Sequence, residues 1–263
     1  MNISLLISTY NWKEALRQSL LSIFNQTVLP HEILIADDGS TDDTRLLIDE
    51  MREISPVPII HLWQEDDGFR VASIRNKAIA RATGDYIVQI DGDIFVNKHF
   101  IQDHIEMAEE GYFVCGSRVL LSPLQTVQLL TGNRNQTKVS PKMVMNAIRF
   151  KPLRHFLAKR YARDSYRNVR GCNMAFWRKD LIAINGYNEV FDSWGPEDKE
   201  LVARLLNLGI KKKSLKMGGV AFHLHHKELS KAGLKKLKDV FIHSIGKGDI
   251  RATNGLDKHL KVV

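Results

Sequence analysis

The sequence predicts an α/β fold built on a doubly wound, mostly parallel sheet. Short apolar segments that are typical of buried strands alternate with amphipathic helical patterns through the first hundred residues. Polar clusters follow several of these strands, at the edge where sheets of this class bind ligands. The chain has 263 residues, of which 44% are hydrophobic and 26% charged, so it can bury a substantial core.

The alternation is regular enough to place each element in order. Helices are expected where apolar residues recur at helical spacing, and strands where short apolar runs end in polar turns. Ser40 or Thr41 can cap the second helix. The expected elements are a strand at Ile3–Thr9, a helix at Trp12–Gln26, a strand at Glu32–Ala36, a helix carrying Leu46, Leu47, Ile48 and Met51, a strand at Val57–Leu62, a helix at Val71–Ala82 and a strand at Tyr86–Ile90.

The strand at Tyr86–Ile90 runs directly into Asp91-Gly92-Asp93. At strand spacing the two aspartates point to the same side, and the glycine between them lets a ligand approach the backbone. Two carboxylates that leave most of a coordination sphere open suit Mg²⁺ or Mn²⁺ carrying a substrate phosphate. Such triplets are usually turns, but three more polar clusters fall at strand ends here: Thr9-Tyr10-Asn11, Asp37-Asp38 and Glu65-Asp66-Asp67.

The second half of the chain is less regular. Residues 123–170 read as a loop and short helical pieces, a pattern typical of a lid or of disorder. A regular pattern resumes at residues 171–176, and a turn is expected at Asn185–Asn188. Pro196 can sit in the first turn of a helix that runs to Leu208.

Three histidines close this half of the chain. His223 and His225 share one face at the end of a short apolar strand, whereas His226 is expected to point the other way. A lone histidine is usually structural. Alternate histidines at a strand end, in a chain with a free Asp-Gly-Asp, are candidate metal ligands.

Positive charge is concentrated in two segments of a chain whose net charge is +8. Residues 134–170 hold 11 Lys and Arg against one acid, and residues 211–261 hold 13 against four. Basic segments attract nucleic acid, anionic lipid or phosphorylated substrates, or are simply solvated surfaces. We expect no nucleic acid, because aromatic residues are not interleaved with the basic ones. The tail from Leu229 predicts a basic amphipathic helix that lies on an anionic membrane surface or packs against the domain.

The remaining features point to a cytoplasmic protein. The N-terminus reads as a strand rather than a signal peptide, and no window approaches membrane-spanning length. Cys115 and Cys172 form no CxxC pair, so neither zinc nor a disulfide is indicated. No Walker A or G-x-G-x-x-G motif follows the first strand, which argues against a P-loop or an ordinary dinucleotide site.

Taken together, these motifs resemble glycosyltransferase family 2, inverting enzymes of the GT-A fold. They are most similar to bacterial chondroitin-polymerase-like members and share a C-terminal pattern with β-1,4-galactosyltransferases. The resemblance covers Ile3 to about His226. The residues that carry it are Ser8-Thr9-Tyr10-Asn11, Asp37-Asp38-Gly39-Ser40, Gly68-Phe69-Arg70, Arg75-Asn76, Asp91-Gly92-Asp93, Asn185-Gly186-Tyr187 and Trp194-Gly195-Pro196-Glu197-Asp198.

The resemblance implies a role for each part of the chain. Residues 1–98 would form the nucleotide-sugar-binding half of one GT-A domain, residues 99–226 its acceptor-binding and catalytic half, and residues 227–263 a basic tail. Asp198 would be the catalytic base. The nucleotide would contact Thr9, Tyr10, Asp38, Arg70, Arg75, Asn76, Asp91 and Gly92, the acceptor would contact Trp194, Glu197 and Asn173, and a Mn²⁺ or Mg²⁺ ion would bind Asp93, Asp91 and His223, with His225 as the alternate ligand.

The implied reaction is metal-dependent, inverting transfer of a hexose or N-acetylhexosamine from a UDP-sugar to a glycan or lipid-linked acceptor, in surface polysaccharide or lipopolysaccharide synthesis. A single catalytic module implies the addition of one sugar rather than an alternating polymer. Pro196 departs from the glycine of the galactosyltransferases. Basic residues 134–170 suggest an anionic or lipid-diphosphate-linked acceptor. The alternatives are a silent sugar-nucleotide-binding scaffold and a nucleotidyltransferase, although the glycine-rich loop of the latter is missing.

Overall fold

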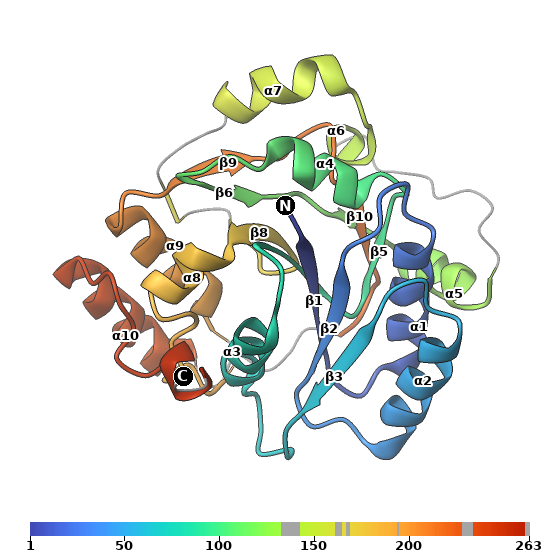
Figure 1. The fold of residues 1–263 in the computed structure, drawn as a ribbon, viewed down its shortest axis with the longest axis horizontal. Coiled ribbons are helices and arrows are strands. Elements are labelled where there is room, and N and C mark those ends of the chain that lie inside the picture. The colour runs from blue at the N-terminus through green and yellow to red at the C-terminus, as the bar shows by residue number, and fades with distance from the viewer. Residues whose placement is uncertain (133–142, 161–164, 167–168, 194, 228–233, 261–263) are drawn as a thin grey trace.

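The computed structural model describes residues 1–132, 143–160, 165–166, 169–193, 195–227 and 234–260. Strands and helices alternate through the first half of the chain as the sequence predicts (Figure 1). None of the helices in these ranges is long and apolar enough to cross a membrane.

A seven-stranded sheet forms the centre of the molecule (Figure 1). The strands β1, β2, β3 and β4 are mutually parallel, whereas β8 runs antiparallel to both of its neighbours, β4 and β6. Because β8 pairs with β4, residues on both sides of position 98 belong to one sheet. In spatial order the strands are β3 (Ile59–Trp63), β2 (Glu32–Asp37), β1 (Ile3–Thr9), β4 (Tyr86–Asp91), β8 (Asn173–Trp177), β6 (Tyr112–Cys115) and β9 (Lys211–Ser214).

Helices cover both faces of this sheet. One face carries α1 (Lys13–Phe24), α2 (Asp42–Glu53) and α4 (Phe100–Met107), and the other carries α3 (Val71–Arg81), α8 (Arg178–Ala183) and α9 (Glu197–Asn207). Strand alternation separates two cores, so that Leu5 and Ile7 of β1 pack in the first and Leu6 in the second. Thr41 stands at the N-cap of α2 but makes no capping hydrogen bond, contrary to the expectation from sequence.

A second, three-stranded sheet joins distant parts of the chain next to the end of β4. Its strands are β5 (Ile94–Val96), β10 (Ala221–His223) and β7 (Val119–Leu120), with β10 in the middle. His223 lies opposite Ile94, one residue after Asp93. This sheet therefore brings the histidines of the C-terminal part beside the Asp-Gly-Asp turn.

The described part of the basic segment is docked on the domain by ion pairs. After α5 (Pro123–Leu130) come α6 (Val144–Ala147) and α7 (Lys151–Arg160), which lies near α4 (Figure 1). Arg154 of α7 is fully buried and pairs with Asp103 and, at 2.9 Å, with Glu106 of α4. Arg149 also binds Asp103, at 2.9 Å. Arg154 belongs to the basic segment 134–170 that was expected to attract an anionic acceptor, but its charge is used within the fold.

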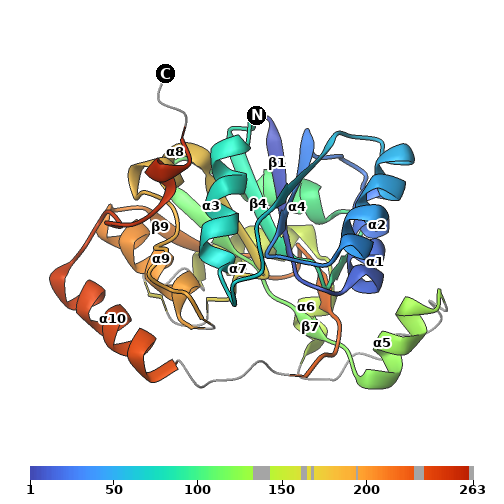
Figure 2. The ribbon, with the colours of Figure 1, turned by 90° about the horizontal axis from the view of Figure 1, so that it is seen from below.

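The C-terminal helix α10 (Leu234–Lys247) lies outside α9 (Figure 2). Its residues Leu237 and Phe241 are 2% and 9% exposed and cluster with Phe191. The ring of Tyr166 meets Phe241 edge-on at a centroid distance of 5.3 Å. Of the two alternatives for this helix, packing against the domain is the one that the structure shows.

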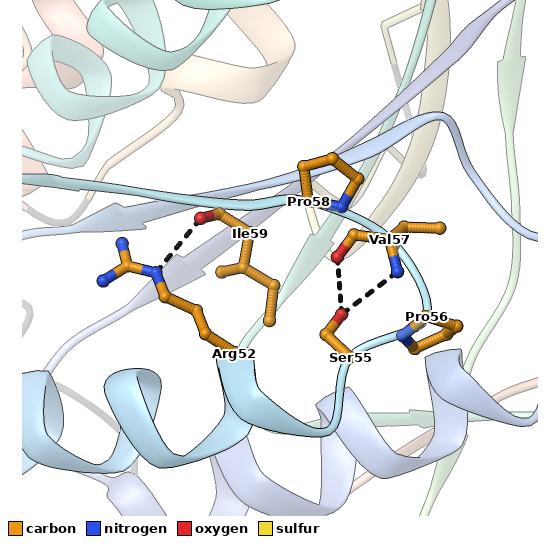
Figure 3. A pocket seen from close by; sticks show the side chains of 6 residues that line it. All are labelled: Arg52, Ser55, Pro56, Val57, Pro58 and Ile59. Carbon is orange, nitrogen blue, oxygen red and sulfur yellow. Dashed lines mark hydrogen bonds between the residues drawn. The ribbon is translucent and has the colours of Figure 1, made fainter.

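A shallow depression lies at the start of β3, where Arg52, Ser55 and residues 56–59 line it (Figure 3). Arg52 Nε donates to the carbonyl of Ile59 at 3.1 Å. The hydroxyl of Ser55 donates to the carbonyl of Val57 at 2.6 Å. Since β3 begins here, this depression is at the amino edge of the parallel strands. It is therefore separate from the predicted site at their carboxyl edge.

Candidate active site

The carboxyl ends of β1, β2 and β4 meet along one edge of the sheet. Thr9 at the end of β1 is level with Asp37 at the end of β2, and Ser8 is level with Asp91 at the end of β4. The backbone N–H of Gly92 donates to the carbonyl of Ser8 at 2.7 Å. Parallel pairing thus brings together the clusters that the sequence shows far apart.

Asp38 and Tyr10 form one end of the site. Tyr10 is 50% exposed, and its hydroxyl donates to Asp66 at 2.9 Å. Asp38 is buried, and its carboxylate accepts from Gln64 Nε2 at 2.6 Å and from the backbone N–H of Arg70 at 2.8 Å. Burial raises the pKa of Asp38, although these donors oppose the rise. A fixed carboxylate beside an accessible ring suits an N–H donor on a planar base.

The loop after β3 shapes the same end. The guanidinium of Arg70 donates to the carbonyl of Glu65 and lies 3.7 Å from Asp67. Gly39, with φ of +96°, packs against this loop so closely that a Cβ would come within 2.6 Å of Asp66 Cα. Only glycine fits there, and the two loops are held together as one wall.

Arg75 on α3 is the central cation of the site. It is 4% exposed, and its Nη2 donates to Asp91 at 3.0 Å while its Nη1 donates to Asp198 at 3.1 Å. Its Nε donates to the hydroxyl of Ser8 at 2.9 Å, and its guanidinium lies over the ring of Tyr187, 5.2 Å from the centroid. Arg75 therefore joins the end of β4 to the start of α9.

Two predicted binding residues prove to be structural. Asn76 is fully buried, its amide nitrogen donates to Tyr187 O and Glu189 at 2.8 Å each, and its oxygen accepts from Tyr187 N–H. Asn173 is also buried, with its amide bonded to two backbone carbonyls and to His104. Neither amide is available to a nucleotide or an acceptor, so both assignments from sequence were wrong.

Asp93, His223 and His226 form what we call the metal triad. The Nε2 atoms of His223 and His226 lie 3.4 and 3.2 Å from Asp93 Oδ2, and one ligand atom of each residue lies within 4.8 Å of the others. The expectation that His226 points away was wrong, because β10 ends at His223 and strand alternation stops there. His225 lies outside the triad, and its N–H donates to the Thr126 hydroxyl at 2.8 Å.

The ligand atoms of the metal triad are suited to a divalent cation. Oδ1 of Asp93 is buried and has no hydrogen-bond partner among the described residues. Such an orphaned oxygen is costly unless a cation or donor satisfies it. Burial, followed by the charge of Asp91, raises the pKa of Asp93 to about 7. Two imidazole nitrogens favour Mn²⁺ over Mg²⁺, which prefers oxygen ligands. Asp91, the other predicted ligand, instead pairs with Arg75.

Asp198 is held in one orientation and remains partly open. Its Oδ2 accepts from the backbone N–H of Gly171 at 2.8 Å, and its Oδ1 accepts from Arg75 and, at 3.3 Å, from the hydroxyl of Tyr187. Its side chain is 19% exposed. A fixed carboxylate with remaining lone pairs open to the site can take a proton from a bound hydroxyl.

Glu197 precedes Asp198 in the first turn of α9 and is buried. Its Oε1 lies 3.9 Å from Arg75 Nη1, and its Oε2 has no hydrogen-bond partner within the described part of the chain. Burial, followed by the charge of Asp198, raises the pKa of Glu197 to about 8. Near neutral pH this carboxyl therefore keeps its proton and can donate a hydrogen bond to a ligand.

Sequence reasoning left some parts of the site open or unseen. Trp194, the predicted acceptor platform, lies outside the described residues. Sequence reasoning missed the contributions of Gly171 and His226. The glycine directly after Arg170 was a visible signal, whereas the position of His226 depends on where β10 ends.

Comparison with known proteins decides the family. A model described as glycosyl transferase family 2 matches residues 4–184. The chain belongs to glycosyl transferase family 2. A model described as the N-terminal domain of galactosyltransferase matches residues 151–227 of this family 2 chain, a range that contains Asp198, His223 and His226.

Relatives of this family 2 chain include polysaccharide synthases. It is 26% identical over 238 residues to a chondroitin synthase of Escherichia coli, covering 84% of this chain and 34% of that protein. It is 24% identical over 240 residues to a hyaluronan synthase of Pasteurella multocida, and the match covers 85% of this chain and 24% of that protein. The chain therefore spans about a third or less of these relatives.

Solved structures share the fold. Residues 1–349 of S. aureus TarS in complex with UDP-GlcNAc match with a TM-score of 0.64 at 17% identity, covering 98% of this chain and 69% of that one. The mannosyltransferase PcManGT of Pyrobaculum calidifontis, in complex with GDP-Man and Mn²⁺, matches with a TM-score of 0.59 at 18% identity, covering 89% and 59%. The predicted GT-A fold is thereby confirmed.

Proposed function

We propose that this chain is an inverting, metal-dependent glycosyltransferase that moves a hexose or N-acetylhexosamine from a UDP-sugar to a glycan or lipid-linked acceptor in surface polysaccharide or lipopolysaccharide synthesis. The observation that carries the proposal is the pairing of Arg75 with Asp91 at 3.0 Å and with Asp198 at 3.1 Å. One guanidinium thereby fixes the donor-side carboxylate and the candidate base relative to each other.

The chemistry follows from this arrangement. Asp198 takes the proton of an acceptor hydroxyl as its oxygen forms a bond to the anomeric carbon, and the bond from that carbon to the diphosphate oxygen breaks. The electron pair of the broken bond leaves with UDP. Attack from the side opposite the leaving group inverts the anomeric carbon. The N–H of Gly171 and the guanidinium of Arg75 hold the Asp198 carboxylate in a fixed orientation.

Around Asp198, neighbouring side chains would select and orient the acceptor. Protonated Glu197 would donate a hydrogen bond to an acceptor hydroxyl, with Trp194 as the proposed sugar platform. Asp93, His223 and His226 would hold a Mn²⁺ ion, which as a Lewis acid would stabilise charge on the leaving diphosphate. The Mn²⁺ in the PcManGT complex supports this choice of ion.

UDP is proposed as the nucleotide because Asp38 can accept from an imide N–H beside the accessible ring of Tyr10. The UDP-GlcNAc complex of TarS supports this reading, whereas PcManGT binds GDP-Man on a similar fold. The polysaccharide synthases among the relatives support a glycan product. We place the reaction at the cytoplasmic face of the membrane, where apolar side chains exposed on β7 and α5, such as Leu120 and Leu124, would contact the lipid of the acceptor.

Thermal melting with UDP, GDP, CMP and dTDP, each with and without Mn²⁺, tests the proposal. A ligand that binds the native state raises Tm, so UDP should raise Tm by several degrees only when Mn²⁺ is present. Asp93→Asn should abolish this shift. Asp198→Asn should retain the shift and lose transfer to acceptor, which separates donor binding from catalysis. A larger shift with another nucleotide would change the donor, and no shift with any of them would reject the proposed reaction.

The alternatives predict different results in the same experiments. A silent sugar-nucleotide-binding scaffold would bind UDP and Mn²⁺, yet wild type and Asp198→Asn would show equal turnover. A nucleotidyltransferase would instead release pyrophosphate from a nucleoside triphosphate and a sugar phosphate. Asp198, held by Arg75, and Asp93, grouped with His223 and His226, favour the transferase.

A further inference from the structure

We call Arg118, Arg170 and Lys216 the cation cluster. They come from three segments that contact one another, and one of these segments leads into β7, the neighbour of β10. Lys216 Nζ donates to the hydroxyl of Ser117 at 2.7 Å, which fixes the segment before β7 against it. Arg118 Nη1 donates to the sulfur of Cys172 at 3.5 Å, which ties it to the segment that carries Arg170. That segment also supplies the N–H that binds Asp198.

Within the described residues, no member of the cation cluster has an acidic partner at ion-pair distance. Lys216 Nζ bonds two neutral oxygens, those of Ser117 and, at 3.0 Å, of the Asn146 amide. Toward the described side chains, Arg118 uses one of its five N–H donors, on the sulfur of Cys172. Its Nε is buried without a partner in the same part of the structure. Among the described residues, Arg118 and Lys216 thus have no carboxylate partner.

Arg118 of the cation cluster lies near the metal triad without neutralising it. Arg118 directly precedes β7, in which Val119 lies opposite Phe222 and Leu120 lies opposite His223. It is therefore a close neighbour of the metal triad along the second sheet. The nearest carboxylates have other partners, because Asp91 pairs with Arg75 and Asp93 faces two histidines. The cluster is thus not explained as a counterion for these acids.

We propose that the cation cluster binds a diphosphate beside the metal triad. A diphosphate offers several oxygen acceptors at short spacing, which matches the free donors of Arg118 and the ammonium of Lys216. Burial and the charge of Arg170 lower the pKa of Lys216, and a bound anion would reverse that effect. The inference rests on the proposed function, since either the nucleotide-sugar donor or a lipid-diphosphate acceptor can supply this group.

Calorimetric titration of Arg118→Gln and Lys216→Met tests the inference and separates the two sources. Loss of one charge-assisted phosphate contact should weaken binding roughly 10- to 100-fold. If the donor supplies the group, UDP with Mn²⁺ binds more weakly to both variants while uridine is unaffected. If the acceptor supplies it, UDP binding is unchanged, and inorganic pyrophosphate loses its affinity for the UDP-loaded variants.

Lys211→Gln is the matched control, because it removes one positive charge from an exposed position at the start of β9. It should change neither titration. Equal binding of UDP and of pyrophosphate to wild type, Arg118→Gln and Lys216→Met would overturn the inference. Failure of the proposed function looks different: wild type would bind no nucleotide, and pyrophosphate titrated alone would still test the cluster.

Discussion

The backbone N–H of Gly171 donates a 2.8 Å hydrogen bond to Oδ2 of Asp198. This contact needs glycine, because a Cβ at position 171 would lie 2.3 Å from that oxygen. The backbone just before β8 thereby orients the carboxylate of the candidate base. The position of the carboxylate depends on the absence of a side chain on its neighbour.

Gly171→Ala should cost activity through geometry alone. The added methyl must displace Asp198, and a misplacement of about 1 Å in a reacting group can cost roughly 10²-fold in rate. We expect kcat for transfer to fall by about that factor while the Tm shift by UDP with Mn²⁺ is retained. Gly246→Ala is the control, since nothing lies within 4 Å of a Cβ there. Equal kcat for both variants would show that Asp198 is not held as described.

His226 rather than His225 should determine metal affinity. His226→Ala removes an imidazole 3.2 Å from Asp93, whereas His225→Ala removes one outside the metal triad. We expect His226→Ala to weaken Mn²⁺ binding at least about 10-fold. Loss of a residue that only hydrogen-bonds to a metal ligand already has an effect of this size, and loss of the ligand itself should have no smaller one. Electron paramagnetic resonance of free Mn²⁺ measures the affinity directly. A larger loss with His225→Ala would contradict the assignment.

Arg154 should matter for stability, in contrast to its neighbour Lys151. Both contact Glu106, but Arg154 is fully buried and Lys151 is 59% exposed. Removing one partner of a buried pair costs about 3–5 kcal/mol, so Arg154→Met should lower the free energy of unfolding by that order. Lys151→Met should lower it by about 0–1 kcal/mol. Urea denaturation gives both values, and similar losses would argue against a buried ion pair.

Glu197 should make stability depend on pH. The pKa of this carboxyl is raised from its ordinary 4.5 to about 8 by burial and by Asp198, so the folded state binds a proton that the unfolded state releases. The contribution is full below pH 4.5 and is lost as pH rises through about 8. Glu197→Gln mimics the protonated form. Its Tm advantage over wild type should therefore grow with pH and level off above about 8.

Melting curves between roughly pH 5 and 9 measure this difference. Glu53→Gln is the control, because it removes an exposed carboxyl at the end of α2. Its Tm difference from wild type should show no such trend with pH. A Tm difference that stays constant across the range would mean that Glu197 is ionised throughout.

The sheet was predictable because its signals are local. The strand at Tyr86–Ile90 is a short, mostly apolar segment of residues that favour strands, and β1 was placed at Ile3–Thr9 from the same kind of pattern. Parallel pairing then fixes which ends meet, so the positions of Asp38 and Asp91 near one edge needed no further information. The place of Asp198 in the first turn of α9 was expected only from the family resemblance. The choice of Asp93 and His223 as neighbours also followed from spacing at strand ends.

The direction of individual side chains was not predictable in the same way. Asn76 follows Arg75 on α3, but adjacent residues on a helix point about 100° apart, so Asn76 faces the turn at Tyr187. His226 depends on where β10 ends, which is set by its partners. The pairing of Arg154 with Asp103 joins segments that no local pattern connects, so charge counts alone suggested a binding surface.

The antiparallel pairing of β8 with β4 also governs how the chain matures. β4 is synthesised early, yet its second neighbour appears only after α4, β6 and the whole basic segment have emerged. Until then β4 has a free row of N–H and C=O groups with apolar side chains on both faces, which is a template for pairing with other chains. A nascent chain that stops before residue 173 keeps this edge open, so we expect premature termination to give an aggregating fragment rather than an inactive domain.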